Sequence, residues 1–232
     1  MSIRENIVHI NSLKEEAAVR SGRSGEDVLL VAVTKLHTVE EINEAIDCGI
    51  TDIGENKVQE IMEKYDHVKP VRWHLIGHLQ TNKVKYIIDK VSMIHSVDSL
   101  HLAQEIDKRA AQHNLTMDIL IQVNSAREES KFGITTDETE QLIHDILGTC
   151  PHVHIRGLMC IAPFEENPDD ARVYFAEVKK QYDEFAKISH PNLDFRYLSM
   201  GMSGDFQVAI EEGSNLVRVG TAIFGARDYS KK

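Results

Sequence analysis

The sequence is poor in cysteine and has no long apolar run. Its three cysteines, Cys48, Cys150 and Cys160, form no CxxC pair, and an odd number in a chain of 232 residues does not suggest a disulfide framework. The charged N-terminal segment lacks the apolar core of a signal peptide, and no run of about 18 uncharged apolar residues occurs. These absences predict a cytoplasmic protein that neither spans nor is anchored to a membrane.

Basic residues are also scarce relative to acidic ones. The chain has 26 Lys and Arg against 37 Asp and Glu, which gives a formal net charge of -11. Nonspecific nucleic-acid binding needs a positive surface that neutralises backbone phosphates, so a nucleic-acid partner is disfavoured. Local positive charge inside an acidic protein can still hold a small phosphorylated ligand.

Short β-rich runs alternate with helical stretches along most of the chain, as in βαβ units around a parallel sheet. The eight predicted strands are Val28–Lys35, Asp52–Glu55, Arg72–Gly77, Met93–Val97, Asp118–Asn124, His154–Ile161, Phe195–Met200 and Leu216–Gly220. The predicted helices between them are Thr38–Cys48, Lys57–His67, Asn82–Asp89, Leu100–His113, Asp137–Leu147, Asp169–Ile188 and Phe206–Glu212.

No linker or low-complexity tract divides this series of units. Eight units with right-handed crossovers favour closure of the sheet. We therefore expect one domain over residues 1–232, with an α/β fold of the (β/α)8 TIM-barrel type. An extra N-terminal helix, Met1 to Arg20, is expected to cover the bottom of the barrel.

Lys35 is the first candidate site residue, because ligands bind at the carboxyl ends of barrel strands. It follows the apolar run Val31–Val33 and is expected to enter the upper interior of the barrel. A buried lysine has a lowered pKa, which favours the neutral amine that attacks an aldehyde. Alternatively, Lys35 emerges at the end of the strand and reaches water or pairs with Glu55.

Arg218 lies within the otherwise apolar last strand, and a buried guanidinium needs an acceptor or an anion. Gly220 and Thr221 follow it and allow backbone N–H groups to approach a ligand, as in the phosphate sites of barrel proteins. The alternative is that Arg218 pairs with Glu211 or Glu212 and that Gly220 only bends the strand.

Ser203 and Gly204 precede the last predicted helix, whose N-terminus provides free N–H groups and a favourable dipole for an anion. Alternatively, Ser203 is only a helix N-cap. Two adjacent anion-binding elements favour a phosphate more than either element does alone.

Other catalytic patterns are missing from the sequence. His74 and His78 are too far apart on a strand to share a metal ion, and no third ligand follows, so we expect no metal site. There is no GxSxG nucleophile motif, and His95 has no evident partner arrangement. We assign no residue a catalytic role.

Several motifs in order resemble those of the YggS/PROSC family of pyridoxal phosphate homeostasis proteins, and YlmE-like members most closely. The matching segments are Ala32-Val-Thr-Lys35, Gly54-Glu-Asn56, Trp73-His-Leu-Ile-Gly-His-Leu-Gln80, Glu128-Glu-Ser-Lys-Phe-Gly133, Gly157-Leu-Met159, Ser199-Met-Gly-Met-Ser-Gly-Asp205 and Asn215 to Gly225. The resemblance extends over nearly the whole chain.

This resemblance implies the barrel of the alanine racemase N-terminal domain and pyridoxal 5'-phosphate (PLP) as cofactor, held as a Schiff base on Lys35. It further implies cofactor-binding roles for the phosphate-binding group Ser203, Gly204, Gly220 and Thr221, for Arg218 facing the pyridine nitrogen, and for Asn56 and His78 beside the ring.

The same resemblance implies a role in PLP homeostasis, namely storage, buffering or delivery of PLP, with PLP-dependent apoenzymes as partners. Arginine can only donate a hydrogen bond to the pyridine nitrogen, which restrains carbanion chemistry. The racemase's second domain, which supplies a catalytic tyrosine, has no counterpart after Gly225, where Tyr229 lies in a short tail. We expect a non-catalytic monomer, and the alternative is a low-activity PLP-dependent amino-acid racemase.

Overall fold

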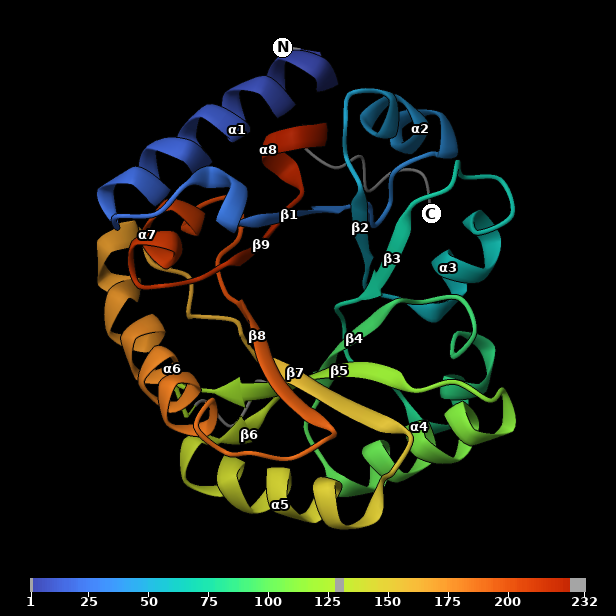
Figure 1. Cartoon of the computed structure of the whole chain (residues 1–232). Coiled ribbons are helices and arrows are strands. Elements are labelled where there is room, and N and C mark those ends of the chain that lie inside the picture. Colours follow the sequence, from blue (N-terminus) through green and yellow to red (C-terminus); the bar gives the residue numbers. More distant parts are fainter. Residues whose placement is uncertain (1, 128–131, 226–232) are drawn as a thin grey trace.

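Parallel strands form a closed barrel in the computed structural model, which describes residues 2–127 and 132–225. Their order is β4-β3-β2-β1-β9-β8-β7-β5, and pairing of β4 with β5 closes the ring, as Figure 1 shows along the barrel. The strands are β1 (Leu29–Val33), β2 (Asp52–Glu55), β3 (Arg72–Leu75), β4 (Met93–Val97), β5 (Met117–Asn124), β7 (Val153–Cys160), β8 (Leu193–Ser199) and β9 (Leu216–Val219). The predicted TIM-barrel fold is confirmed.

Helices surround this barrel in Figure 1. They are α1 (Ile3–Arg20), α2 (Val39–Asp47), α3 (Val58–Lys64), α4 (Leu100–Gln112), α5 (Thr139–Thr149), α6 (Arg172–Phe185), α7 (Phe206–Glu211) and α8 (Thr221–Phe224). Short 3-10 helices are η1 (Gly25–Asp27), η2 (Thr81–Tyr86), η3 (Thr136–Glu138) and η4 (Pro168–Ala171). The predicted α-helix over Asn82–Asp89 is wrong, because this segment forms η2 and a turn. A two-residue strand, β6 (Ile134–Thr135), pairs with β5 and was not predicted.

The N-terminal helix α1 begins with a capping box, in which Ser2 and Glu5 bond to each other's backbone N–H groups. Its buried face, including Ile7 and Ala17, packs in the main core, and the helix contacts α7 and α8. The helix therefore belongs to the outer ring and does not extend across the bottom of the barrel as expected (Figure 1).

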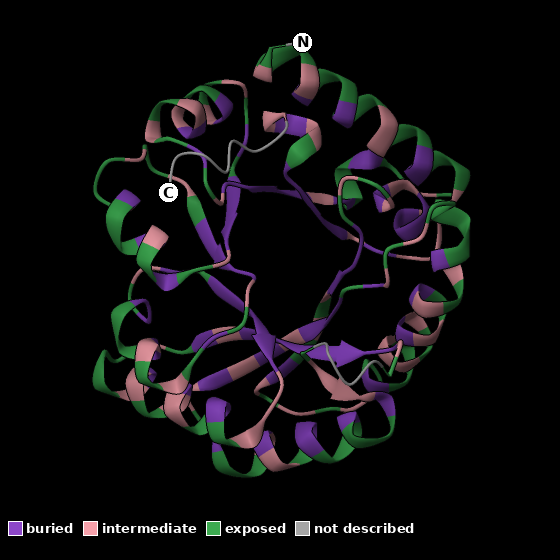
Figure 2. Cartoon of the chain, turned by 180° about the vertical axis from the view of Figure 1, so that it is seen from behind, coloured by how far each residue is buried: buried purple, intermediate pink, exposed green. Residues whose placement is uncertain are grey.

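Strand residues alternate between the helices and the barrel interior, as the pleat requires. Leu30 and Ala32 of β1 belong to the main core under the helices, whereas Val31 and Val33 are buried outside that core. Figure 2 shows that the strands are buried along most of their length while the outer faces of the helices are exposed. The interior side also contains several buried polar side chains, which are Asp52, His74, His95, Ser199 and Arg218.

Within the described ranges, no helix combines the length and the apolar character that a membrane span requires. Residues 128–131 of the Glu128 to Gly133 motif, and Tyr229, lie outside the described residues.

Candidate functional site

The structure places every predicted site residue at one end of the barrel, with Arg218 just inside it. Lys35 follows β1, Asn56 follows β2 and His78 follows β3. Ser203 and Gly204 lie between β8 and α7, and Gly220 and Thr221 lie between β9 and α8. Because all strands are parallel, their carboxyl ends form a common mouth, which is where barrel proteins bind ligands.

Ser203 joins two of the predicted phosphate-binding segments. Its Oγ accepts hydrogen bonds from the N–H groups of Gly220 (3.2 Å) and Ala222 (3.3 Å). The N-cap of α7 is Asp205, so the alternative in which Ser203 only caps that helix is wrong. A side chain at Gly204 would meet no atom within 4 Å, which leaves open space beside these donors.

Backbone N–H groups that converge on one small polar atom are a suitable cradle for an anion. Thr221 is exposed at the edge of this cradle, and Gly220 is buried at its base. The N–H donors, the Ser203 hydroxyl and the open space at Gly204 fit the phosphate group of a cofactor, which supports the sequence-based prediction on independent grounds.

Arg218 is 3% exposed and lies inside the barrel below the mouth. Its Nη1 donates to the Ser199 carbonyl oxygen (2.9 Å) and Oγ (2.5 Å), and its Nη2 donates to the Cys160 carbonyl oxygen (2.9 Å). Burial lowers the pKa of the guanidinium, and the negative charge of Asp205 opposes this shift. The bonds to Ser199 and Cys160 fix the plane of the guanidinium.

The proposed alternative partners of Arg218 are engaged elsewhere. Glu211 and Glu212 both accept hydrogen bonds from Arg172 of α6, at 3.0 Å for Glu212. Glu211 also accepts a bond from Arg20 of α1. The alternative that Arg218 pairs with either glutamate is wrong, because the guanidinium points into the barrel and the glutamates lie in the outer ring.

A buried ion pair lies directly behind the predicted cofactor lysine. Glu55 Oε1 accepts hydrogen bonds from Lys64 Nζ (2.8 Å) and from Thr34 Oγ1 (2.8 Å). Glu55 is fully buried and Lys64 is 9% exposed. Burial raises the pKa of Glu55, although the charge of Lys64 opposes this shift.

Lys64 also helps to hold the backbone on both sides of Lys35. Lys64 Nζ donates to the Thr34 carbonyl oxygen (3.0 Å) and to Glu60 Oε2 (2.8 Å), which in turn accepts from the Leu36 N–H (2.7 Å). Leu36 has a φ of 66°, in the left-handed region that leucine rarely adopts. The cluster therefore fixes an unusual turn that presents Lys35, which is half-buried at the mouth.

Asn56 and His78 line adjacent strand ends. Asn56 is half-buried, and its backbone comes so close to Gly77 that a Cβ there would lie 2.4 Å from the Asn56 carbonyl oxygen. His78 is exposed and stacks on Phe132, with ring centroids 4.0 Å apart. Gly77 is therefore needed for the close approach of the two strand ends, whereas His78 contributes a ring at the outer edge.

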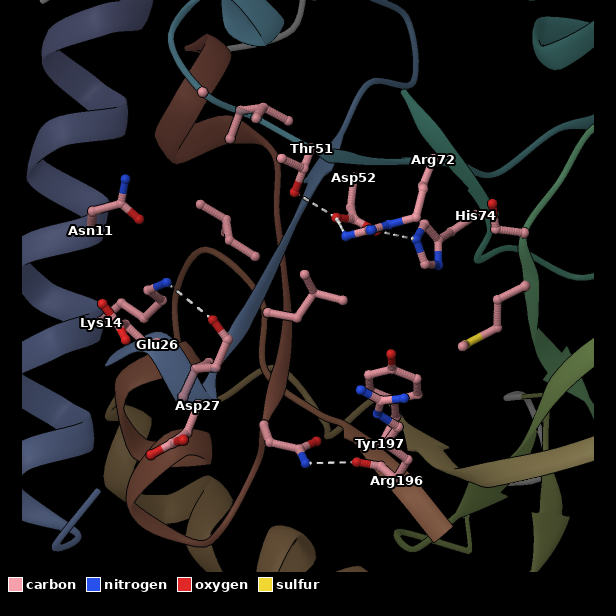
Figure 3. A pocket seen from close by; sticks show the side chains of 18 of the residues that line it. Asn11, Lys14, Glu26, Asp27, Thr51, Asp52, Arg72, His74, Arg196 and Tyr197 are labelled. Atoms are coloured by element: carbon pink, nitrogen blue, oxygen red, sulfur yellow. Dashed lines mark hydrogen bonds and ion pairs between the residues drawn. The ribbon is translucent and has the colours of Figure 1, made fainter. Parts of the chain in front are cut away.

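A cavity of about 620 Å³ lies at the opposite end of the barrel. Figure 3 shows Asp52, Arg72 and His74 pointing toward one another at its wall. Asp52 accepts bonds from Arg72 Nε (2.7 Å) and His74 Nε2 (2.8 Å). Burial alone raises the pKa of Asp52, but the hydrogen bonds from His74, Arg72 and Thr51 outweigh it and hold the pKa far below its usual value. The carboxylate of Asp52 therefore already has hydrogen-bond donors from within the protein.

Sequence reasoning missed Lys64 as a support of Lys35 and His95 as a partner of His74. The two imidazoles are 2.9 Å apart, from His74 Nδ1 to His95 Nε2. His74 and His95 each interrupt an otherwise apolar strand at a position that faces the barrel interior. This pattern was the sequence signal that could have identified them as partners. Among residues 2–127 and 132–225, no three His, Cys, Asp or Glu side chains are grouped to hold a metal ion.

Comparisons with known proteins agree with this fold. The alanine racemase N-terminal domain family matches residues 8–228. The pyridoxal phosphate homeostasis protein of Aquifex aeolicus is 42% identical, with 99% of this chain and all of that protein covered. The Escherichia coli K12 protein of the same name is 39% identical, with 99% of each chain covered. The solved structure of PipY from Synechococcus elongatus PCC7942 with PLP bound has a TM-score of 0.83 and 31% identity, covering 97% of this chain and 100% of PipY. The chain belongs to the family of pyridoxal phosphate homeostasis proteins, built on the barrel of the alanine racemase N-terminal domain.

Proposed function

We propose that this protein binds PLP at the mouth of the barrel through a covalent bond to Lys35 Nζ and takes part in PLP homeostasis. The observation that carries the proposal is the arrangement of a half-buried lysine, an anion cradle and a buried arginine at one end of the barrel. These groups match the aldehyde, the phosphate and the ring nitrogen of PLP. PLP binding in PipY and the names of the full-length relatives support it.

The phosphate is assigned to Ser203, Gly204, Gly220 and Thr221. The N–H group of Gly220, now bonded to Ser203 Oγ, would donate to a phosphate oxygen, and the Ser203 hydroxyl would turn to donate as well. Asn56 and His78 are assigned to the two sides of the ring. The Glu55–Lys64 pair would hold Lys35 in place without touching the cofactor.

The bound cofactor supplies an electrophilic carbon and a ring that can accept electrons. Arg218 stays protonated and only donates, so it would favour an unprotonated ring nitrogen and weaken that electron sink. We therefore assign the protein a carrier function, in which it stores PLP or delivers it to PLP-dependent apoenzymes. We assign it a monomeric state.

The covalent attachment is tested with Lys35→Ala, and Lys108→Ala on the exposed side of α4 is the matched control. Each protein is incubated with PLP and its absorption spectrum is recorded, and borohydride reduction followed by mass spectrometry of tryptic peptides then locates the label. We expect a visible band and a modified peptide containing Lys35 in the native and Lys108→Ala proteins. Equal labelling of Lys35→Ala at other lysines would refute the assignment.

The carrier function is tested by incubating the loaded protein with L-amino acids in deuterated water. We expect the Cα–H signal to exchange no faster than with free PLP. Sustained exchange above that rate would instead support the racemase alternative. Transfer is followed separately, by adding a PLP-dependent apoenzyme and measuring the gain of its activity.

A further inference from the structure

An unbroken chain of hydrogen bonds crosses the barrel interior from Arg218 to Asp52. Arg218 Nη1 lies 2.5 Å from Ser199 Oγ, and Ser199 Oγ lies 3.2 Å from His95 Nδ1. His95 Nε2 lies 2.9 Å from His74 Nδ1, and His74 Nε2 lies 2.8 Å from Asp52 Oδ1. The five residues come from β9, β8, β4, β3 and β2, and none is more than 3% exposed.

The chemistry of the two ends determines the direction of the protons in this chain. A guanidinium can only donate, and an ionised carboxylate can only accept. With both imidazoles neutral, Ser199 donates to His95, His95 donates from Nε2 to His74, and His74 donates from Nε2 to Asp52. This single arrangement leaves no atom of the chain unsatisfied.

The surroundings of His95 support its neutral form, and the position of Asp52 decides which nitrogen of His74 faces it with a proton. Burial lowers the pKa of His95 well below its usual value, and the nearby charge of Arg218 lowers it further. His74 is 3% exposed and has the Asp52 carboxylate as its acceptor, which fixes the proton on Nε2. The remaining nitrogen, Nδ1, is then free to accept from His95.

The chain ends at the cavity opposite the mouth. Arg72 Nε and Nη2 lie 2.7 Å and 2.6 Å from the two Asp52 oxygens, and the Arg72 side chain is 59% exposed. Figure 3 shows this bidentate pair beside His74 at the cavity wall. Asp52 is thus anchored from the solvent side, and its charge is held at a fixed position below the barrel interior.

We infer that Ser199, His95, His74 and Asp52 are positioning residues for Arg218, and that they tie the surroundings of the PLP ring nitrogen to the far end of the barrel. The inference rests on the proposed function, because Arg218 acts through the cofactor ring. Each group in the chain turns its lone pair toward Arg218 and its proton toward Asp52. Such aligned dipoles strengthen one another in a buried site and stabilise the guanidinium charge.

The chain also restricts the orientation of Arg218. Ser199 Oγ can accept from Nη1 only while its own proton points to His95 Nδ1, so the histidine tautomer decides where the guanidinium finds its acceptor. Removal of the Ser199 hydroxyl leaves Nη1 with the Ser199 carbonyl alone and leaves His95 Nδ1 without a donor. The guanidinium would then turn away from the ring nitrogen.

The tautomers are tested first in PLP-free protein labelled with 15N at histidine. From the hydrogen-bond geometry we expect a proton on Nε2 and none on Nδ1 in both His95 and His74. A proton on Nδ1 of His95 would overturn the inference. This measurement needs no cofactor, so it stands even if the native protein fails to take up PLP, an outcome that would refute the proposed function instead.

The effect on the cofactor is tested with Ser199→Ala, with Ser214→Ala as matched control. Ser214 is also fully buried, but its hydroxyl contacts backbone carbonyls of β8 and β9 outside the chain of side chains. Each protein is loaded with PLP labelled at the ring nitrogen. In Ser199→Ala we expect the ring 15N resonance to shift while the phosphate 31P resonance stays constant, and neither to shift in Ser214→Ala. An unchanged ring resonance in Ser199→Ala, or an equal shift in both variants, would show a structural role only.

Discussion

The two ends of the barrel differ in how fully their polar groups are satisfied. At the amino ends of the strands, one carboxylate, Asp52, accepts bonds from Thr51, Arg72 and His74 around a cavity of about 620 Å³. At the carboxyl ends, the N–H groups of Gly220 and Ala222 share a single hydroxyl oxygen of Ser203. A cavity alone is therefore a weaker sign of a ligand than donors that share one neutral acceptor.

From this contrast we expect the ion pairs at the amino end to stabilise the fold without a ligand. We expect the mouth to stabilise it mainly when a ligand is bound. The chain of hydrogen bonds from Asp52 to Arg218 connects these two regions. Variants at either end separate the contributions of the two regions to stability and to PLP binding. They follow from the largest expected effect to the smallest.

The largest effect is expected from Lys64→Met, which removes the partner of Glu55 behind the mouth. An uncompensated buried charge should lower the free energy of unfolding by about 3–5 kcal/mol. Urea denaturation of ligand-free protein measures this loss, and Lys108→Met on the exposed side of α4 is the control. Adding Glu55→Gln to Lys64→Met should restore part of the stability. A loss no larger than that of the control would mean that the pair does not support the turn at Lys35.

PLP itself should stabilise the native protein through the mouth. At a free concentration of about 100 times its Kd, the gain in unfolding free energy is about 2.7 kcal/mol. Thermal denaturation with and without PLP measures it as an upward shift in Tm. The shift should largely disappear in Lys35→Ala and persist in the exposed control Lys108→Ala. Equal shifts in native and Lys35→Ala proteins would place the main PLP contact elsewhere.

The amino end should make the protein sensitive to acid through Asp52. The pKa of this carboxyl is lowered in the folded state, so below its ordinary value of 3.8 the unfolded chain binds a proton that the folded chain does not. Stability present above that pH is therefore lost as the pH falls. One group contributes at most about 1.4 kcal/mol per pH unit, and solvent at the cavity reduces this limit. Urea denaturation at several acidic pH values should show a shallower decline for Asp52→Asn, and parallel declines would contradict the assignment.

The smallest effect is expected from Ser203→Ala at the mouth. The open space at Gly204 lets water reach the N–H groups that this substitution frees, so stability without ligand should change by less than about 0.5 kcal/mol. PLP affinity should fall by about 1 kcal/mol, or roughly fivefold, because one hydrogen bond to the phosphate is lost. Fluorescence titration with PLP measures the difference, with Ser189→Ala as an exposed control. Unchanged affinity would remove Ser203 from the phosphate site.

The strand assignments could be made from sequence because hydrophobic alternation and length act locally. All eight predicted barrel strands are present, and Thr38 caps α2 through a capping box with Glu41. The segment after Gln80 was predicted as an α-helix from its apolar spacing, yet it forms the 3-10 helix η2. Packing against α4 and α3 decides that geometry, which local propensity does not contain.

The candidate site was only partly predictable. Lys35, Ser203 and Gly220 could be selected because strand ends in a parallel barrel converge, whatever the detailed packing. The bonds from Lys64 to Glu55 and from His95 to Ser199 join residues 9 and 104 positions apart. No spacing rule predicts such partners, since they depend on strand register and on which side chain faces inward.

The sequence by itself determined the barrel, because the alternation of strands and helices is a local property repeated around a closed sheet. It also determined which polar residues end the strands. Only the tertiary structure decided that Arg218 faces Ser199 rather than Glu211, and that two histidines join Asp52 to the opposite end. Those contacts arise where closure of the sheet brings distant strands within hydrogen-bonding distance, and closure is a property of the whole chain.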